Sequence, residues 1–229
     1  MAELRQITDE VGKRLRELMS EQHRREKDRK LEQFRQLNRY IRKGQTLFTG
    51  SSLMEMFPIA EFCANDGLPV VYNRGIGGYT TDEFLAGIDV MLLDPEPSKL
   101  FLNIGTNDIR EMPDGEDWFE HLSRNERRIC EIIRDRLPDT EVWLMAYYPV
   151  NLRRAAEAGW GQMTRTNEAV ARANRMVEAL AAEFGFHYID VNDGLKDAAG
   201  DLLYEHTADG IHFDPDAYRT VYDRLKHLL

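Results

Sequence analysis

The segment Gly50-Ser51-Ser52-Leu53 has residue types suited to acyl chemistry. An apolar run over residues 46–48 predicts a buried strand that stops at Gly50, and a helix-like apolar pattern begins at Leu53. A serine hydroxyl at such a junction lies near helix N-terminal amides, which suits a nucleophile whose attack generates an oxyanion. Glycine and serine are also ordinary residues of a turn and helix cap, so this segment alone does not establish catalysis.

A glycine-rich segment, residues 73–80, follows the second predicted strand. Its three glycines, Gly75, Gly77 and Gly78, expose backbone amides and permit close approach of a ligand. The spacing is not that of a dinucleotide-binding fingerprint, and the chain has no Gly-Lys-Ser/Thr phosphate loop, so a nucleotide site is not expected. A plain glycine turn capped by a following threonine is the alternative interpretation.

Gly105-Thr106-Asn107-Asp108 follows the third predicted strand. The side-chain amide of Asn107 offers an N–H donor that stays neutral at every relevant pH, which suits an oxyanion hole. Asparagine and aspartate are also common turn formers, so a structural turn is the alternative.

Asp209 and His212 lie just before the last predicted helix, where Asp214 is typical of an N-cap and Pro215 of a first helical residue. At this spacing in a turn, the carboxylate of Asp209 can reach one imidazole nitrogen and leave the other free as a general base. An isolated Asp-x-x-His is usually structural. With the three earlier segments, however, it completes a nucleophile, a base, an orienting acid and oxyanion donors.

The elements that must position these residues alternate between short strands and longer helices. This alternation predicts a mostly parallel α/β sheet covered on both faces. In such sheets, sites form beyond the carboxyl ends of the strands. The strands are expected at residues 46–48, 70–72, 100–104, 142–146 and 188–189, and the helices near residues 53–64, 81–92, 118–136, 166–184 and 215–228.

Residues 1–43 predict an N-terminal helical extension to a single domain spanning residues 44–229. Residues 20–30 are almost entirely polar or charged and are expected to form a solvated helical surface. We expect one helix or a helix pair packed on the domain or on another subunit. The charge asymmetry and interrupted apolar stripe of this segment further predict self-association through the N-terminal helices, and hence a homo-oligomer. A basic arm for nucleic acid or membrane is the alternative. The apolar helical spacing is carried by Leu4, Ile7, Val11, Leu15 and Leu18, and resumes at Leu31, Phe34, Leu37 and Ile41.

The composition limits the possible classes of function. Hydrophobic residues make up 42% and charged residues 31%, as in a soluble globular protein, and the net charge of −10 argues against a nucleic-acid-binding body. Cys63 and Cys130 are too few for a disulfide framework. The histidines outside the Asp209–His212 segment have no metal-ligand spacing. No signal peptide or membrane-spanning run is visible, and we therefore expect a cytoplasmic protein.

The four segments together resemble the SGNH (GDSL-type) hydrolase family, and most closely its platelet-activating-factor acetylhydrolase-like branch. The resemblance covers the chain from the first strand to the last helix. It implies that Ser52 is the nucleophile, His212 the base and Asp209 its orienting acid. It also implies an oxyanion hole formed by the N–H groups of Ser52 and Gly78 and by the Asn107 side chain. A flavodoxin-like three-layer α/β/α sandwich, with no metal or organic cofactor, is implied as well.

Two residues depart from the family pattern. Ser51 stands where the family usually has aspartate, and Tyr79 stands where an aspartate commonly follows the glycine. Neither change removes an implied catalytic atom. We expect a serine esterase that hydrolyses small acyl esters through an acyl-enzyme, with acetyl favoured by family analogy alone. The alternatives are a lysophospholipase, a thioesterase, or a catalytically silent binding module of the same fold.

Overall fold

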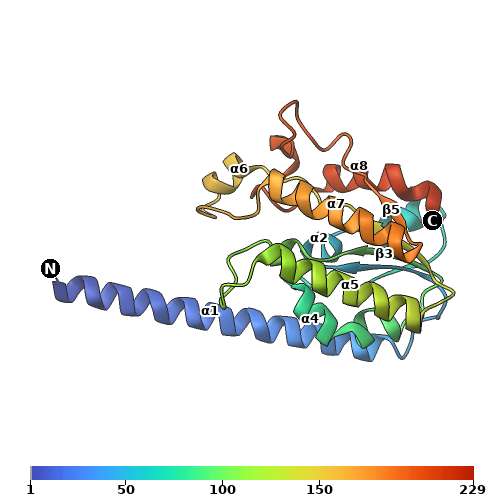
Figure 1. Ribbon diagram of the computed structural model, residues 1–229, viewed down its shortest axis with the longest axis horizontal. Coiled ribbons are helices and arrows are strands. Elements are labelled where there is room, and N and C mark those ends of the chain that lie inside the picture. The colour runs from blue at the N-terminus through green and yellow to red at the C-terminus, as the bar shows by residue number, and fades with distance from the viewer. Residues whose placement is uncertain (1) are drawn as a thin grey trace.

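A computed structural model describes the chain over residues 2–229, with side chains described from Glu10 onward (Figure 1). Five parallel strands form one sheet in the order β2-β1-β3-β4-β5. The strands are β1 (Thr46–Gly50), β2 (Val71–Asn73), β3 (Lys99–Asn103), β4 (Glu141–Met145) and β5 (His187–Ile189). The helices are α1 (Ala2–Leu37), α2 (Ser52–Glu55), α3 (Ile59–Asn65), α4 (Thr81–Ala86), α5 (Trp118–Arg136), α6 (Leu152–Glu157), α7 (Asn167–Phe184) and α8 (Pro215–Leu225).

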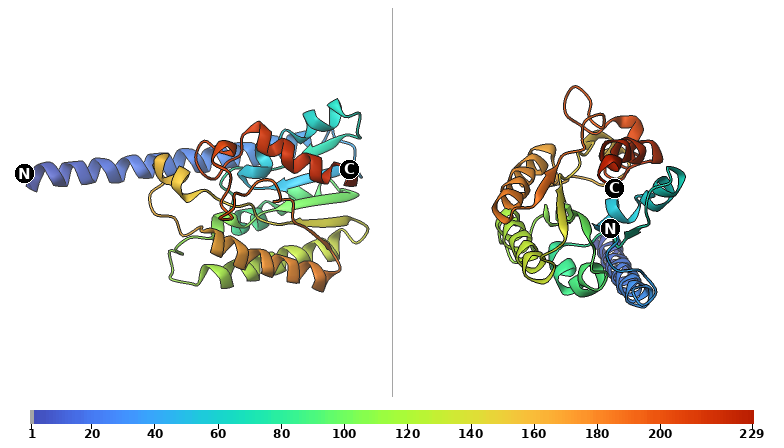
Figure 2. Two further views of the ribbon diagram at one scale, coloured as in Figure 1. Left: turned by 90° about the horizontal axis from the view of Figure 1, so that it is seen from above. Right: turned by 90° about the vertical axis from the view of Figure 1, so that its right-hand side faces the viewer.

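The sheet is the middle of three layers, because alternate residues of each strand point to opposite faces. Leu47 of β1 packs into the core beneath α4, α5 and α7. The next residue, Phe48, packs into the second core, beneath α2, α3 and α8, where its ring stacks on that of Phe101 with centroids 4.6 Å apart. Figure 2 shows the helices on both sides of the sheet. The predicted α/β/α sandwich is therefore confirmed, with a sheet that is parallel throughout.

Three local expectations were wrong. The apolar pattern over residues 53–64 forms two helices because Pro58 interrupts the backbone hydrogen bonding between them. The pattern over residues 81–92 ends as an α-helix at Gly87 and continues as a π-helical turn over Asp89–Leu93. Helix α6 was not expected, although Asn151 caps it by accepting a hydrogen bond from the Arg154 N–H.

The N-terminal extension forms one helix, α1, rather than a pair. Its C-terminal half packs on the domain through Leu31 and Phe34, and the Arg74 guanidinium lies 5.0 Å from the Phe34 ring centroid. The N-terminal half projects beyond the sheet (Figure 1), and its apolar side chains from Val11 to Met19 are largely exposed. Self-association through this helix and a boundary at residue 43 stay predictions. No helix over residues 2–229 has both the length and the apolar content to cross a membrane.

The junction after β1 depends on a glycine. Gly50 has φ +150°, and a side-chain carbon there would overlap the Asn103 carbonyl group, 2.7 Å from its carbon. Gly44 also has positive φ, +74°, but a side-chain carbon added there would have no neighbouring atom within 4 Å. The close approach of β1 and β3, as well as the φ angle, therefore requires glycine at position 50.

We expect Gly50→Ala to lower the free energy of unfolding by at least about 3 kcal/mol, because it adds an overlap to the backbone strain. Gly44→Ala, the matched control, should lose only about 1–2 kcal/mol from strain alone. Urea unfolding of both variants measures the difference. Equal losses would show that the contact with Asn103 is unimportant.

Candidate active site

Ser52 lies at the first residue of α2, directly after the end of β1. The Ser51 N–H donates to the Asn103 carbonyl oxygen at 3.2 Å, which ties this junction to the end of β3. Ser51 is the N-cap residue but makes no side-chain capping bond, and it is only 1% exposed. Ser52 instead lines a pocket. Of the two serines, Ser52 is the one that a ligand can reach.

The side chain of His212 bridges Ser52 and Asp209. Its Nε2 lies 2.9 Å from Ser52 Oγ, and its Nδ1 lies 2.7 Å from Asp209 Oδ2. The structure therefore brings together Ser52, from the start of the domain sequence, with Asp209 and His212, from near its end. The contacts run from the hydroxyl to the imidazole and from the imidazole to the carboxylate. With a proton on Nδ1, the Nε2 lone pair faces the serine hydroxyl.

Hydrogen bonds hold Asp209 in its ionised form. Burial raises the pKa of this carboxyl, but donation from the His212 and Ile211 backbone N–H groups and from the His212 ring outweighs burial and lowers it below its usual value. The two backbone bonds to Oδ1 measure 2.8 and 3.0 Å. A carboxylate fixed in this way can balance a positive charge on the imidazole.

Helix α6 supports the loop that carries Asp209 and His212. The Gly210 carbonyl oxygen accepts from the Asn151 N–H at 2.8 Å. Gly210 has φ +82°, and a side-chain carbon there would lie 2.8 Å from the Ala155 side chain. The loop therefore packs directly on α6, which places His212 relative to the sheet.

The glycine-rich loop after β2 passes beside Ser52. A side-chain carbon at Gly77 would lie 3.8 Å from Ser52 Cβ. The Gly77 N–H donates to Glu55 of α2, whereas the Gly78 N–H has no acceptor among the described residues. The Gly78 amide therefore differs from that of Gly77 in having no hydrogen-bond partner in the described part of the chain.

Asn107 lies in the loop after β3, with its side-chain amide held from both ends. Nδ2 donates to the Tyr79 carbonyl oxygen at 2.8 Å, and Oδ1 accepts from Arg165 at 2.7 Å. If the amide were flipped, Nδ2 would face the Arg165 donor and Oδ1 would face the Tyr79 carbonyl oxygen, so neither hydrogen bond could form. These contacts therefore assign the orientation of the amide, and Nδ2 keeps a second N–H for a ligand.

Arg165 also belongs to the site, through its contact with Asn107, although no sequence pattern pointed to it. It precedes α7 in a loop without any motif, and burial lowers the pKa of its guanidinium to about 10. Its Nε is buried without a hydrogen-bond partner among the described residues. The guanidinium remains charged at neutral pH and fixes Asn107 from a segment 58 residues away.

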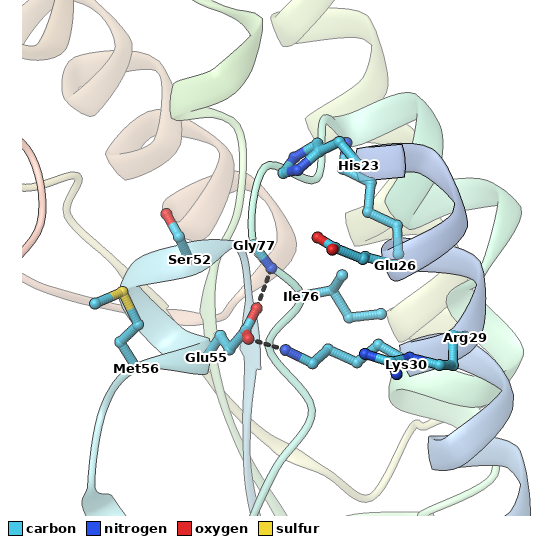
Figure 3. A pocket seen from close by; sticks show the side chains of 10 residues that line it. His23, Glu26, Arg29, Lys30, Ser52, Glu55, Met56, Ile76 and Gly77 are labelled. Atoms are coloured by element: carbon cyan, nitrogen blue, oxygen red, sulfur yellow. Dashed lines mark hydrogen bonds and ion pairs between the residues drawn. The ribbon is translucent and has the colours of Figure 1, made fainter. Parts of the chain in front are cut away.

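A pocket of about 290 Å³ opens beside Ser52 and has a wall formed by α1 (Figure 3). Most side chains of residues 20–30 are exposed, as expected for a solvated helix, but Lys27 and Lys30 are partly buried against the domain. Lys27 donates to the Gly78 carbonyl oxygen at 2.8 Å, and Lys30 forms an ion pair with Glu55. The pocket is lined by Ser52, Glu55, Met56, Ile76 and Gly77 and, from α1, by His23, Glu26, Lys27, Arg29 and Lys30. No cluster of metal-ligating side chains occurs among the described residues.

A buried acid lies beneath the loop that carries Asn107. Glu126 of α5 is 3% exposed and accepts from the Tyr147 hydroxyl at 2.8 Å. A side-chain carbon at Gly105 would lie 3.0 Å from Glu126 Oε1. Burial raises the pKa of Glu126 from 4.5 to about 8, against the effect of the Tyr147 hydrogen bond. Glu126 is therefore mainly protonated at neutral pH.

The chain matches the model of the GDSL-like lipase/acylhydrolase family over residues 57–220. The chain belongs to this family. Because the match begins after Ser52, the nucleophile assignment depends on the geometry described above. No curated protein matched the chain.

Solved structures of family members and esterases have the same fold. The chain is similar to "a putative platelet activating factor from Streptococcus pneumonia", with 29% identity, a TM-score of 0.82, and coverage of 93% of this chain and 96% of that one. A GDSL-like lipase from Bacteroides thetaiotaomicron is 19% identical, with a TM-score of 0.70 and coverage of 86% and 96%. An acetylxylan esterase from Geobacillus stearothermophilus is 15% identical, with a TM-score of 0.62 and coverage of 82% and 96%.

The raised pKa of Glu126 predicts a pH-dependent effect on stability. The native chain keeps this proton up to about pH 8, whereas the unfolded chain loses it near pH 4.5, so ionisation of Glu126 destabilises the fold as pH rises through this window. We expect Glu126→Gln to be more stable than wild type at pH 8, by on the order of a few kcal/mol, with the advantage disappearing near pH 4.5.

Urea unfolding of wild type and Glu126→Gln at several pH values measures this difference. Glu120→Gln, on the exposed surface of the same helix, controls for loss of a carboxylate from α5. A stability difference between wild type and Glu126→Gln that does not change with pH would contradict the prediction.

Proposed function

We propose that this family member is a serine esterase that hydrolyses small acyl esters through an acyl-enzyme. The observation that carries the proposal is the continuous contact from Ser52 Oγ through the His212 ring to Asp209, at 2.9 and 2.7 Å. Such an arrangement lets a serine hydroxyl act as a nucleophile at neutral pH.

In the first half-reaction, Ser52 Oγ attacks the ester carbonyl carbon as its proton passes to His212 Nε2. Asp209 keeps the ring oriented and balances the imidazolium charge. The tetrahedral intermediate then collapses, and the carbon–oxygen bond to the alcohol breaks. His212 gives its proton to the departing alcohol oxygen, which leaves an acyl group on Ser52.

The second half-reaction repeats these steps with water. His212 takes a proton from water, the resulting hydroxide attacks the acyl carbon, and the Ser52 oxygen leaves with the proton held by His212. A carboxylic acid is released, and the serine and neutral histidine are restored.

The oxyanion donors proposed for both steps are the N–H groups of Ser52 and Gly78 and the second Nδ2–H of Asn107. The free Gly78 amide and the fixed orientation of the Asn107 amide support this assignment. Donors held in place before the reaction stabilise the developing charge without reorganising, and one such donor contributes about 3–4 kcal/mol.

Ser52→Ala should lower the rate of p-nitrophenyl acetate hydrolysis by at least about 10⁴-fold, because it removes the attacking oxygen. Ser51→Ala, the matched control one residue away, should keep most of the activity, since Ser51 is buried outside the proposed triad. A fluorophosphonate probe should label wild type and Ser51→Ala but not Ser52→Ala.

Two outcomes would count against the proposal. Equal activity of wild type and Ser52→Ala would exclude Ser52 as the nucleophile. A wild-type protein that neither hydrolyses the ester nor reacts with the probe would favour the silent binding module.

A short acyl group, such as acetyl, is the proposed substrate feature. The pocket of about 290 Å³ lies at the lower end of the size range of small-molecule sites, which supports a small substrate. Acetyl itself rests on the family analogy and on similarity in fold to the acetylxylan esterases.

We expect kcat/KM on p-nitrophenyl esters to be highest for acetyl and to fall by at least about tenfold at octanoyl, because charged side chains such as Glu26 and Arg29 line the pocket and disfavour a long alkyl chain. A profile of acyl chain length measures this preference. A maximum at octanoyl would favour the lysophospholipase alternative, and a higher kcat/KM on matched acetyl thioesters would favour a thioesterase.

A further inference from the structure

We propose that helix α1 preforms the oxyanion hole, with Lys27 and Lys30 as positioning residues for the Gly77–Gly78 peptide. The inference rests on the proposed function, because it assigns a role to the amide that the mechanism uses. It goes further by making the N-terminal extension part of the catalytic site, although α1 lies outside the region that matches the family model.

The Gly78 N–H belongs to the same planar peptide unit as the Gly77 carbonyl group. Glycine on both sides of this unit removes the steric barrier that side chains would impose, so rotation of the whole peptide is inexpensive here. A rotated peptide would turn the carbonyl oxygen, rather than the N–H, toward the oxyanion. Contacts on the neighbouring peptide units must therefore keep the N–H in place.

On one side, the preceding peptide unit is held through the Gly77 N–H. This group donates to Glu55, and the other carboxylate oxygen of Glu55 forms an ion pair with Lys30 of α1 (Figure 3). The Lys30 side chain is 35% exposed and that of Glu55 is 28% exposed. Lys30 therefore fixes an acceptor that would otherwise be free to change rotamer.

On the other side, the following peptide unit is held through the Gly78 carbonyl oxygen, which accepts from Lys27 Nζ at 2.8 Å. The same ammonium group lies 2.8 Å from both carboxylate oxygens of Glu83. Glu83 is itself fixed by a reciprocal capping box with Thr80. The Lys27 side chain is only 13% exposed, so this bond is largely protected from water.

The two lysines act from one rigid support. Residues three apart lie on the same face of a helix, so Lys27 and Lys30 both face the domain, Lys27 contacting Gly78 and Lys30 contacting Glu55. Leu31 and Phe34 anchor the following turn in the core, and Asn38 accepts from Arg74 Nε at 3.0 Å. Each ammonium charge is balanced by a nearby carboxylate, so the role that follows is placement of the peptide rather than neutralisation of the oxyanion.

The test compares kcat and KM of purified variants of the full chain on p-nitrophenyl acetate. Lys27→Met and Lys30→Met should each lower kcat by about 10- to 100-fold with KM changed less than about threefold, because a misplaced donor weakens mainly transition-state binding. Fluorophosphonate labelling should slow in proportion, since it forms a similar oxyanion.

Lys43→Met is the matched control for both lysines. It removes an ammonium group and a remote surface ion pair, that with Glu96, so kcat should stay within about twofold of wild type. If Lys27→Met has a lowered Tm, the double variant Lys27→Met/Glu83→Gln restores charge balance and should still have low kcat.

Wild-type kcat in folded Lys27→Met and Lys30→Met variants would overturn the inference, as would an equal loss in Lys43→Met. Failure of the proposed function gives a different result, namely wild-type activity that does not exceed that of Ser52→Ala. The two failures are therefore distinguishable in one set of assays.

Discussion

The hydrogen bond between Ser52 Oγ and His212 Nε2, 2.9 Å long, joins two residues that are 160 positions apart. Several features of the fold position these two residues. The parallel pairing of β1 with β3 brings Ser52 to the carboxyl edge of the sheet, and the Gly50 conformation allows the chain to turn there beside Asn103. At the other end, α6 and the start of α8 hold the loop that carries His212.

The oxyanion side of the site depends on polar contacts between separate layers. Arg165 sets the orientation of the Asn107 amide. Lys27 of α1 donates to the Gly78 carbonyl oxygen, and Glu55, which pairs with Lys30 of α1, accepts from the Gly77 N–H. Flexible groups are suitable for catalysis only when their orientation is fixed before charge develops. In this chain, the glycine-rich segment proposed as the oxyanion loop contacts a helix outside the family match.

The departure of Ser51 from the usual family aspartate has a clear structural context. Ser51 is buried and makes no side-chain capping bond. Support for the loops around Ser52 comes instead from Glu55, which accepts from the Gly77 N–H and pairs with Lys30. This contact connects α2, which carries Ser52, to the glycine-rich loop after β2.

The sequence by itself determined the five strands, most of the helices and the family, and it nominated Ser52, Gly78, Asn107, Asp209 and His212 as candidate residues. These follow from local signals, namely apolar periodicity, capping residues and short motifs. The break at Pro58 and helix α6 were missed because a short apolar pattern does not specify where backbone hydrogen bonding stops.

Only the tertiary structure decided which charged residues belong to the site. Lys30 meets Glu55 across 25 residues, Lys27 meets Gly78 across 51, and Arg165 meets Asn107 across 58. In the sequence, Lys27 and Lys30 are indistinguishable from the other charged residues of a solvated helix. Their role arises because α1 packs against the loop after β2, and no local pattern records a contact between distant segments.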